Sequence, residues 1–532
     1  YRRSGRVCPR ILRNKRSYAD TRLQPRRAVR LRAGTRTKMK RRFLSLLLLY
    51  ILSSISLSAQ RFPMVQGIEL DTDSLFSLPK RPWRAIGKTI GVNLAVWGFD
   101  HFIMNEDFAD ISWQTIKSNF QTGFGWDNDK FVTNLFAHPY HGSLYFNAAR
   151  SNGLSFRHSA PFAFFGSLMW ELLMENEPPS INDLCATTIG GIALGEMGHR
   201  LSDLLIDNRT TGWERMGREV AIALINPMRF LNRLTAGEVT SVGSRSGQIF
   251  QSVPINIVVD AGFRFLADKR HARTGATALT LNLRFDYGDP FRSETFSPYD
   301  FFQFKAGLSF SESQPLLSQI NLIGILSGCQ LLAHERTVLV GGLFQHFDYY
   351  NSEKRISKNS EEVLVTPYRI SQVAALGGGL IFQHHGKFRR RPLELYAETY
   401  LNVVPMGASL SDHYNVDNRD YNLGSGLSGK LYLGATYNDL WSWLLGVESY
   451  RLYTWIGYEE PHQKNTDVSS FMVQGDESKA RLLVTSSEFA FHPGPWHVAI
   501  VARRFIRKTA YQFYPNVSFD TGDIQLRVGF HF

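Results

Sequence analysis

The second half of the chain consists of short segments in which apolar and polar residues alternate. In the first segment, residues 255–267, apolar positions run from Ile255 to Phe265 in steps of two, with Asn256, Asp260 and Arg264 between them. Because successive side chains of a β-strand point to opposite faces, this period predicts a strand with one apolar and one polar face. A second segment spans residues 279–287, and ten more are centred on Phe304, Ile323, Leu343, Leu376, Leu395, Leu431, Leu445, Thr485, Ile500 and Leu526.

The number and length of these segments match a membrane barrel, whose strands need about 9–11 residues and are usually even in number. The connections support this interpretation, because such barrels alternate long outer loops with short periplasmic turns. Odd-numbered connections are mostly long, and even-numbered ones are mostly short apart from residues 289–298. The long ones include residues 351–366, 405–420, 456–478 and 508–521, and the short ones residues 333–335, 438–440 and 492–494. The prediction is an antiparallel transmembrane β-barrel of about 12 strands over residues 254–532.

The last segment, residues 523–532, alternates strictly and ends on Phe532. The closing strand of a soluble sandwich would alternate in the same way. The segment resembles the C-terminal signature of Gram-negative outer-membrane barrels, which close on a strand ending in Phe. That resemblance implies a place in the cell outer membrane of a Gram-negative bacterium. It also implies two partners, outer-membrane lipid and the barrel assembly machinery, the latter through Phe532.

The alternation assigns side chains to the two faces of the barrel wall. Apolar residues are expected to face lipid, and charged residues of both signs are expected to form a polar, ion-paired lumen. Aromatic residues near one strand are expected at the membrane interface: Trp441, Trp443, Tyr450, Tyr453 and Trp455. The expected lipid-facing set is Ile257, Val259, Phe263, Leu281, Leu283, Leu526, Val528 and Phe530. The expected lumen set is Asp260, Arg264, Arg284, Asp286, Lys305, Glu394, Glu398 and Arg527.

The positive charge of the chain is concentrated at its beginning. Residues 1–38 contain 14 Lys and Arg residues and one acid, Asp20, so they carry the whole formal net charge of +13. The remainder is neutral, which argues against a nucleic-acid partner. No Met precedes Met39, so residues 1–38 are interpreted as translated upstream sequence, with a basic binding arm as the alternative.

Residues 39–59 have the parts of a secretory signal peptide. Lys40, Arg41 and Arg42 precede an apolar run over residues 43–57, and the small residues Ser58 and Ala59 follow it. Cleavage is expected after Ala59, although a signal anchor is an alternative. Residues 60–82 are expected to form a spacer.

Residues 83–235 are predicted to form a helical domain, joined to the barrel by a linker at residues 236–253. Helices are expected over residues 85–104, 161–174, 183–205 and 219–231, with Asn182 as the N-cap of the third. That helix contains Gly190, Gly191, Gly195 and Gly198, although glycine weakens a helix by roughly 1 kcal/mol relative to Ala. Several glycines in one helix predict close approach by another backbone, either a neighbouring helix or the barrel wall.

Two blocks of this domain resemble the uncharacterised domain-of-unknown-function family 3943, over roughly residues 85–235. The family implies a Gram-negative, Bacteroidetes-like envelope, and it carries no assigned activity. The first block contains His138-Pro139-Tyr140, Gly142, Tyr145-Phe146 and Ala149-Arg150. The second contains Trp170-Glu171, Glu175, Pro178, Asn182-Asp183, Thr187, Gly190-Gly191, Leu194-Gly195-Glu196 and Arg200.

These blocks contain more polar residues than a helical core requires. Glu196 and Arg200 are four residues apart and are interpreted as an ion pair on one helix face. Glu171 follows a strongly apolar run, so we expect it to pair with Arg150 if it is buried. His138 and His141 are weak candidates for metal ligands, and local hydrogen bonding is favoured.

Two classes of function remain open. The preferred class is a structural or transport role, in which the helical domain plugs the lumen or lies in the periplasm. The alternative is an envelope enzyme acting on lipid or glycan, with His138, His141, Glu171, Asp183 and Glu196 as candidate catalytic residues. An enzyme would gather these residues in an open cleft, whereas a scaffold would pair and bury them. No nucleophile, phosphate-loop, dinucleotide or zinc motif occurs, and no cofactor, metal or disulfide is predicted.

Overall fold

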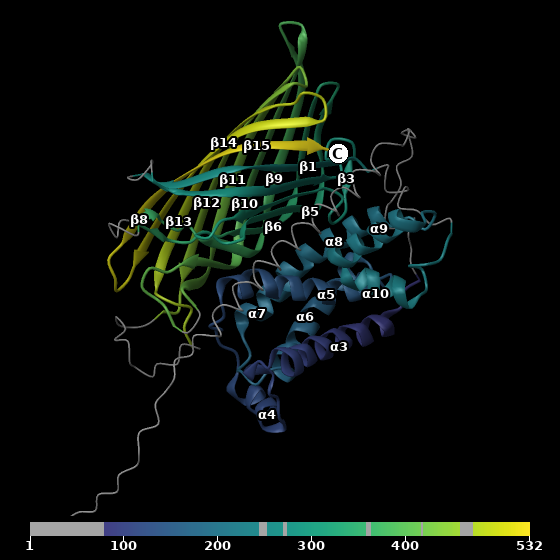
Figure 1. Ribbon diagram of the computed structural model, residues 1–532, viewed down its shortest axis with the longest axis vertical. Coiled ribbons are helices and arrows are strands. Elements are labelled where there is room, and N and C mark those ends of the chain that lie inside the picture. The colour runs from purple at the N-terminus through teal and green to yellow at the C-terminus, as the bar shows by residue number, and fades with distance from the viewer. Residues whose placement is uncertain (1–78, 244–252, 270–273, 358–362, 417–418, 458–471) are drawn as a thin grey trace, which may run out of the picture. The chain divides into compact units, whose positions relative to one another are not determined.

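The computed structural model describes residues 79–243, 253–269, 274–357, 363–416, 419–457 and 472–532 (Figure 1). The expectations for residues 1–38, the signal peptide at 39–59, its cleavage site and most of the spacer lie outside the described residues. Residues 244–252 of the linker expected at residues 236–253 lie outside them as well.

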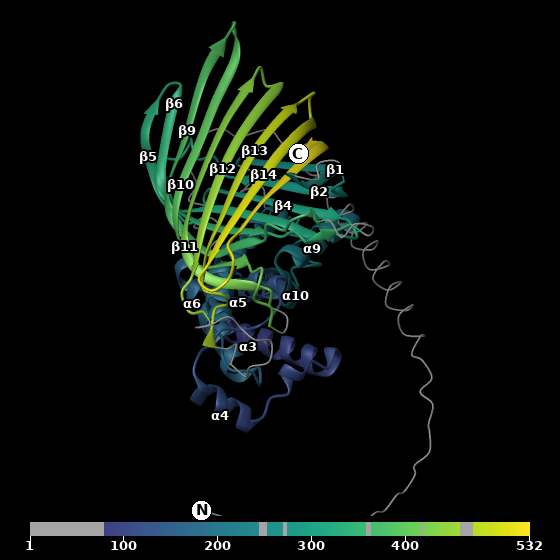
Figure 2. The ribbon, with the colours of Figure 1, turned by 90° about the vertical axis from the view of Figure 1, so that its left-hand side faces the viewer.

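Twelve antiparallel strands form a closed barrel (Figures 1 and 2). Each strand pairs with its neighbour in sequence, and β1 pairs with β15 to close the ring. The barrel predicted from the alternation is therefore confirmed, and every predicted centre falls inside a strand. The strands are β1 (Ile255–Asp268), β2 (Ala276–Tyr287), β4 (Phe302–Phe310), β5 (Leu317–His334), β6 (Thr337–Tyr350), β9 (Ile370–Phe388), β10 (Arg391–Leu410), β11 (Tyr421–Tyr437), β12 (Trp441–Thr454), β13 (Ser478–Phe491), β14 (Trp496–Tyr511) and β15 (Val517–His531).

Short strands and tight turns complete the barrel. β3 (Thr295–Phe296) pairs with β5, while β7 (Arg355–Ile356) and β8 (Val363–Val365) pair with each other in the connection after β6. Two even connections turn at paired positive-φ residues, Arg389-Arg390 and Asn438-Asp439, a backbone that suits the twist of a hairpin. Two expected loops are shorter than predicted, because β10 continues past a bulge to Leu410, and β14 and β15 reach Tyr511 and Val517.

Hydrogen bonds between strands that are not neighbours identify the lumen face. Tyr350 on β6 donates to Glu448 on β12 at 2.9 Å, and Gln303 on β4 donates to Glu398 on β10 at 2.8 Å. Such bonds can form only across the barrel interior. Tyr450, expected at the membrane interface, also donates to Glu448 at 2.5 Å, so that expectation is wrong and its ring lies in the lumen.

Ion pairs line the same face, as the sequence predicted. The Lys430 ammonium lies 2.6 Å from an Asp348 carboxylate oxygen, and both side chains are fully buried. Arg264 lies 3.1 Å from Asp523. On the opposite face, apolar side chains are exposed over one strand after another: Phe263, Leu279, Leu343, Leu380, Leu401, Val403, Leu427, Leu431, Leu433, Trp443, Phe489, Ile500, Leu526 and Val528.

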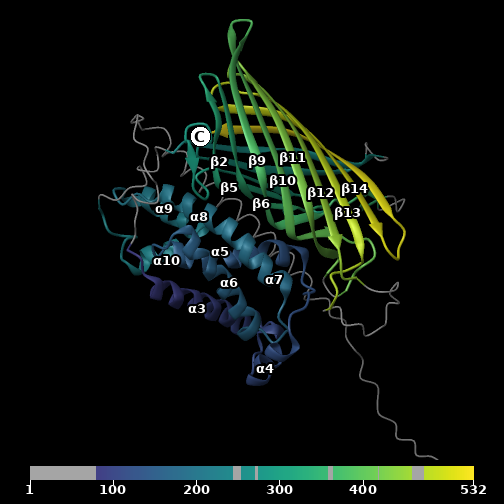
Figure 3. The ribbon, with the colours of Figure 1, turned by 180° about the vertical axis from the view of Figure 1, so that it is seen from behind.

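The helices precede the barrel in the chain (Figure 3). They are α3 (Pro82–Phe99), α4 (Trp113–Thr122), α5 (His138–Arg150), α6 (Phe156–Leu173), α7 (Ile181–Cys185), α8 (Gly191–Leu205), α9 (Gly212–Ile225) and α10 (Pro227–Thr235), with π-helical turns at Asp100–Met104, Thr133–Ala137 and Ala186–Gly190. Within the described part of the chain, no helix is long and apolar enough to cross a membrane.

Three details differ from the expected helices. α4 and α5 were not predicted, because their polar residues obscure the apolar period. The helix expected at residues 219–231 is divided at Asn226-Pro227, since Pro cannot donate within a helix. The N-cap of α7 is Ser180, whose hydroxyl accepts from the Asp183 backbone N–H at 3.3 Å, and Asn182 lies inside the helix.

Glycine allows α5 and α8 to approach closely. A Cβ on Gly142 would lie 1.7 Å from the carbonyl oxygen of Thr187, and one on Gly191 would lie 2.6 Å from the Cα of Gly142. The close approach predicted from the glycines is therefore present, and its main partner is a neighbouring helix. Gly190 also faces the barrel, where its Cβ would lie 3.3 Å from the Phe347 ring.

The helical domain contacts the outer face of the barrel wall. Gln345 on β6 donates to the carbonyl of Ile189 at 2.9 Å, and the Phe131 and Tyr349 rings lie 5.2 Å apart. Gln345 and Tyr349 alternate with the lumen residues Asp348 and Tyr350, so they point outward. The helices thus lie outside the lumen, and the plug that the sequence left open is not the arrangement found.

The helical domain buries several charged residues and exposes many large apolar ones. Buried charged residues include Arg150, Glu171, Glu196, Arg200, Glu219 and Arg233. Exposed large apolar residues include Trp83, Ile86, Ile90, Leu94, Phe99, Phe102, Ile103, Trp113, Phe120, Phe165, Trp213 and Leu234. Exposed apolar area of this extent marks a contact with a protein partner or a membrane.

Candidate functional site

Four of the five candidate catalytic residues meet at one end of α5. His138 begins this helix, His141 lies one turn along it, Glu171 comes from α6 and Asp183 from α7. His138 Nε2 lies 3.4 Å from Asp183 Oδ1 and 4.0 Å from Asp129 Oδ2. The Asp129 side chain is 49% exposed and that of Asp183 only 6%, so the group reaches the surface at Asp129. We call these five residues the His138 cluster.

The acidic side chains of the His138 cluster are held by local donors. The Ser180 backbone N–H donates to Glu171 Oε2 at 2.7 Å, and the Asn182 amide donates to Asp183 Oδ1 at 2.8 Å. Beside them, Trp170 Nε1 donates to Glu175 Oε2 at 3.1 Å. The turn between α6 and α7 therefore orients three carboxyl groups.

Burial keeps protons on these carboxyl groups. It raises the pKa of Glu171 to about 8, with the Asp183 carboxylate adding to the effect, and it raises the pKa values of Asp183 and Glu175 as well. Burial and the neighbouring Asp127 raise the pKa of Asp129 to about 6. The cluster therefore contains carboxyl groups that can gain or lose a proton near neutral pH.

Within the His138 cluster, His141 has hydrogen-bond partners of its own. Its Nε2 lies 2.8 Å from the Tyr145 hydroxyl, which in turn contacts Asn93 Oδ1, and its ring lies 5.1 Å from that of Trp170. Burial, followed by the charge of His138, lowers the pKa of His141 to about 3. His141 is therefore neutral at physiological pH and positions its neighbours, whereas His138 faces the carboxylates.

Glu196, the fifth candidate, lies away from the cluster between two arginines. Arg150 donates to both of its carboxylate oxygens, at 2.7 and 2.8 Å, and Arg200 Nε donates to Oε1 at 3.0 Å. The predicted pair of Glu196 and Arg200 is present. The expected pair of Arg150 and Glu171 is wrong, because the close packing of α5 on α8 brings Arg150 to Glu196 while Glu171 binds the Ser180 backbone.

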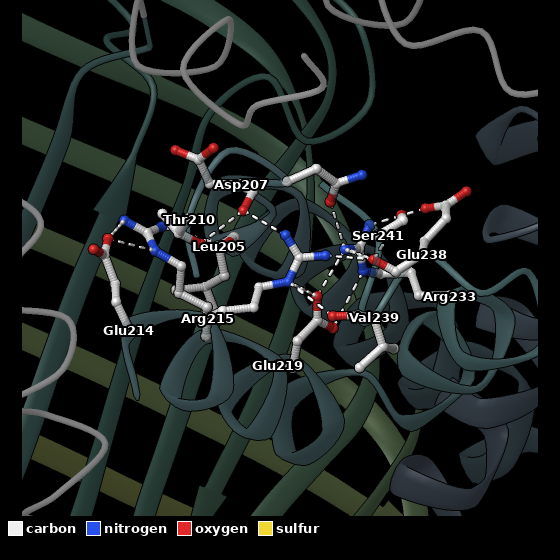
Figure 4. A network of polar contacts seen from close by, with 12 residues as sticks. Leu205, Asp207, Thr210, Glu214, Arg215, Glu219, Arg233, Glu238, Val239 and Ser241 are labelled. Atoms are coloured by element: carbon white, nitrogen blue, oxygen red, sulfur yellow. Dashed lines mark hydrogen bonds and ion pairs between the residues drawn. The ribbon is translucent and has the colours of Figure 1, made fainter. Parts of the chain in front are cut away.

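A second ionic network joins α9 and α10 (Figure 4). Glu219 lies 3.0 Å from Arg215 and 2.7 Å from Arg233, which also lies 3.0 Å from Glu238. Arg215 also donates to the carbonyl of Asp207 at 2.7 Å. These groups satisfy one another within the chain, so the network stabilises the helix pair and offers no open site.

Sequence reasoning missed the segment that completes the His138 cluster. Asp127 accepts from the Asn134 amide at 3.1 Å, and Asn134 also donates to the Tyr421 hydroxyl of β11 at 2.7 Å. Arg419, in the loop before β11, donates to the carbonyl of Asp127 at 2.7 Å. The run Asp127-Asn128-Asp129 was the available signal, but only the fold shows that a barrel loop holds it.

The chemistry open to this arrangement is proton transfer. An imidazole between two carboxyl groups can act as a general acid or base. Asp129, His138 and Asp183 also carry ligand types that metals use, yet their atoms contact one another directly. Glu196 is paired and buried, and the other four candidates lie beside the partly exposed Asp129 carboxylate.

Comparison with known protein families bears on the helical domain. The model of a family described as Domain of unknown function (DUF3943) matches residues 123–228, which confirms the resemblance of that region. This match spans α5 to α9 and therefore includes the His138 cluster. No curated protein matches the chain.

Among solved structures, similar chains include three barrel proteins. The outer membrane channel DcaP of Acinetobacter baumannii is 10% identical, with 53% of this chain and 97% of that chain covered and a TM-score of 0.22. The toluene transporter TodX of Pseudomonas putida is 10% identical, with 52% and 89% covered and a TM-score of 0.21. OmpT, an outer membrane protein of Vibrio cholerae, is 8% identical, with 53% and 97% covered and a TM-score of 0.20. At TM-scores this low, these likenesses carry no argument about the present chain.

Proposed function

We propose that this protein is an outer-membrane β-barrel with a structural or gated transport role, and that its helical domain rests against the barrel beside the bilayer. One observation carries the proposal: both parts of the chain bury their charges and expose apolar side chains. In water this distribution is unfavourable, because exposed apolar area costs roughly 25 cal/mol per Å². In hydrocarbon it is the stable one.

The outer wall of the barrel supports contact with acyl chains. Leu401 on β10 and Leu526 and Val528 on β15 are at least half exposed, whereas their alternating neighbours face the lumen. The wall also contains an apolar hollow of about 340 Å³, lined by residues of β9, β10, β11 and β12. A hollow with apolar walls suits a hydrocarbon chain. It is lined by Phe382, Leu395, Tyr396, Ala397, Leu433, Gly434, Ala435, Trp443 and Leu445.

The lumen favours a structural role or a gated passage over an open pore. Arg503 on β14 donates to Gln319 on β5 at 2.5 Å, and the bonds of Glu448 and Glu398 cross the barrel in the same way. Solute could pass only if such bonds separated. These bonds tie opposite sides of the barrel to one another.

The C-terminus fits a role in assembly. The Phe532 backbone N–H donates to the carbonyl of Ile257 at 2.9 Å, so the terminal residue lies at the seam where β15 meets β1. We include in the proposal that the barrel assembly machinery recognises Phe532, whose ring lies 4.9 Å from that of Phe530.

The helical domain extends the lipid-facing surface. Trp83 and Trp113 are each 81% exposed, and Trp213 is 77% exposed. Tryptophan is enriched at membrane interfaces, where one side of the ring is apolar and the other is wet. We therefore favour a position in contact with the membrane for the helical domain over a position free in the periplasm, which the sequence also left open.

Fluorescence quenching in vesicles tests this arrangement. The folded chain is reconstituted with brominated phospholipids, which quench tryptophan by contact, and is compared with a variant in which Trp83, Trp113 and Trp213 are replaced by Phe. We expect the variant to lose part of the quenched emission. An unchanged quenched fraction would place the helices away from lipid, and recovery of the native chain in the soluble periplasmic fraction would reject the membrane barrel itself.

A second candidate function, modification of an envelope lipid or glycan, is favoured by the His138 cluster. The exposed apolar residues Phe124, Val132 and Tyr140 lie in the same segments, so an acyl group could approach the imidazole. His138→Gln should then change the composition of envelope lipid or glycan by mass spectrometry. The matched control is His101→Gln, because His101 lies 3.0 Å from the exposed Asp110. Unchanged profiles for a correctly folded His138→Gln protein would reject catalysis at this cluster.

A further inference from the structure

Three histidines meet at one end of the barrel lumen, far in sequence from the His138 cluster. His492 lies in the turn between β13 and β14, His497 near the start of β14, and His531 at the end of β15. One ring nitrogen from each lies within 4.8 Å of the other two. His497 and His531 alternate with the outward residues Val498 and Phe530, so both point into the lumen.

The hydrogen bonds of the three rings leave nitrogens directed at one another. His492 Nε2 lies 2.8 Å from the Ser442 hydroxyl, so its Nδ1 is directed toward His497 Nδ1 at 3.5 Å. His531 Nε2 is buried and has no hydrogen-bond partner among the described residues. A buried polar atom without a partner costs about 1–3 kcal/mol, which is an independent sign that a ligand completes the site.

The spacing of these nitrogens suits one metal ion. A zinc–nitrogen bond is about 2.0–2.1 Å, so two imidazole nitrogens on a tetrahedral zinc ion lie about 3.4 Å apart. The observed 3.5 Å between His492 and His497 matches that value but is long for a hydrogen bond between two nitrogens. Imidazole is also a preferred ligand of zinc, copper and nickel.

We propose that His492, His497 and His531 bind one divalent transition-metal ion of the zinc class, with a fourth position open to water. The Ser442 hydroxyl orients His492, in the way that outer ligands commonly fix a metal-bound imidazole. The three ligands come from the β13–β14 turn, from β14 and from β15. The ion therefore fastens the last strand of the barrel to the preceding hairpin, beside the seam where β15 meets β1.

Zinc titration of the folded full-length chain in detergent tests the site. After dialysis against a chelator, calorimetry with Zn²⁺ should show one saturable site per chain. His492→Ala, His497→Ala and His531→Ala should each weaken binding by at least about tenfold, because each removes a ligand. Ser442→Ala keeps all three ligands and should weaken binding less than any of them.

His385→Ala is the matched control, because His385 is an exposed histidine at the end of β9 and is not part of this group. It should bind zinc like the native chain. The zinc-loaded native chain should also show nitrogen neighbours at about 2.0–2.1 Å by X-ray absorption, a measurement that needs no variant to fold. Absence of saturable binding, sulfur neighbours, or native affinity in the triple alanine variant would overturn the proposal.

Zinc should also stabilise the C-terminal strand. Heat-modifiable mobility in gel electrophoresis reports whether the barrel is folded. The zinc-loaded native chain should unfold at a higher temperature than the native chain from which a chelator has removed the metal. The same addition should leave the His531→Ala chain unchanged. This outcome depends on the barrel alone, so it is independent of what the helical domain contacts.

Discussion

The barrel and the helical domain both bury charged side chains and expose apolar ones, but they do so by different means. In the barrel, every second residue faces the lumen, and polar groups such as Lys430 and Asp348 meet there. In the helical domain, charges such as Glu196 are enclosed because glycine lets α5 and α8 come together. Polarity in the barrel follows from local geometry, whereas polarity in the helical domain depends on which helices become neighbours.

The largest effect should come from removing a charge inside the helical domain. Glu196→Ala would leave Arg150 and Arg200 without their shared carboxylate, so the free energy of unfolding should fall by about 3–5 kcal/mol. Denaturant unfolding in detergent measures it. The matched control is Glu214→Ala, since Glu214 is an exposed i,i+4 partner of Arg218 and should cost at most about 1 kcal/mol. Equal losses would show that burial does not distinguish the two pairs.

A charge on the outer wall of the barrel should have the next largest effect. Leu526→Arg should destabilise the folded barrel in lipid by about 2–4 kcal/mol if the residue lies near the midplane. Ser518→Arg is the control, because Ser518 is exposed on the same face near the start of β15 and should cost about 0–1 kcal/mol. Folding titrations in vesicles measure both. A tolerated Leu526→Arg would mean that this wall does not face hydrocarbon.

Replacing a glycine at the contact between α5 and α8 should lower the free energy of unfolding less than either of the two charge substitutions. Gly142→Ala places a Cβ against the Thr187 carbonyl and should cost about 1–3 kcal/mol through overpacking. Gly87→Ala in α3 meets no atom within 4 Å and should stabilise the protein by about 0.5–1 kcal/mol, because alanine favours a helix. The thermal unfolding temperatures of the two variants, compared with that of the native chain, measure these opposite effects. If both changes stabilise, the close packing of α5 on α8 is incorrect.

The smallest effect should be a pH dependence centred on Asp129. Its pKa is raised from 3.8 to about 6, mainly by burial, so the folded chain binds more protons than the unfolded chain between these values. The stability contributed by protonated Asp129 is present below pH 3.8 and lost as pH rises through about 6. Because its side chain is half exposed, solvent screening limits the change to about 1 kcal/mol or less.

Asp129→Asn should remove that dependence. The difference in unfolding free energy between the variant and the native chain should grow in favour of the variant from pH 4 to pH 7. A parallel course for the native chain and Asp129→Asn would contradict the shifted pKa.

The sequence predicts which residue types form the His138 cluster but not which side chains pair there. The polar blocks of the helical domain indicate His138 and Asp183, and the fold places them 3.4 Å apart. Arg150 was assigned to the wrong carboxylate, since its partner depends on the packing of α5 on α8. The group of His492, His497 and His531 has no motif spacing, because register between strands creates it.

The sequence by itself determined the barrel. In a strand, alternation with a period of two determines which face of the sheet each residue occupies. Twelve alternating segments whose every second connection is short allow few closed arrangements other than a barrel. The tertiary structure alone decided where the helices lie, which charges they enclose and which histidines meet. The physical reason is the range of the interactions. Strand polarity is set by adjacent residues, whereas helix contacts such as Gln345 with Ile189 join residues more than 150 positions apart, and no local pattern encodes them.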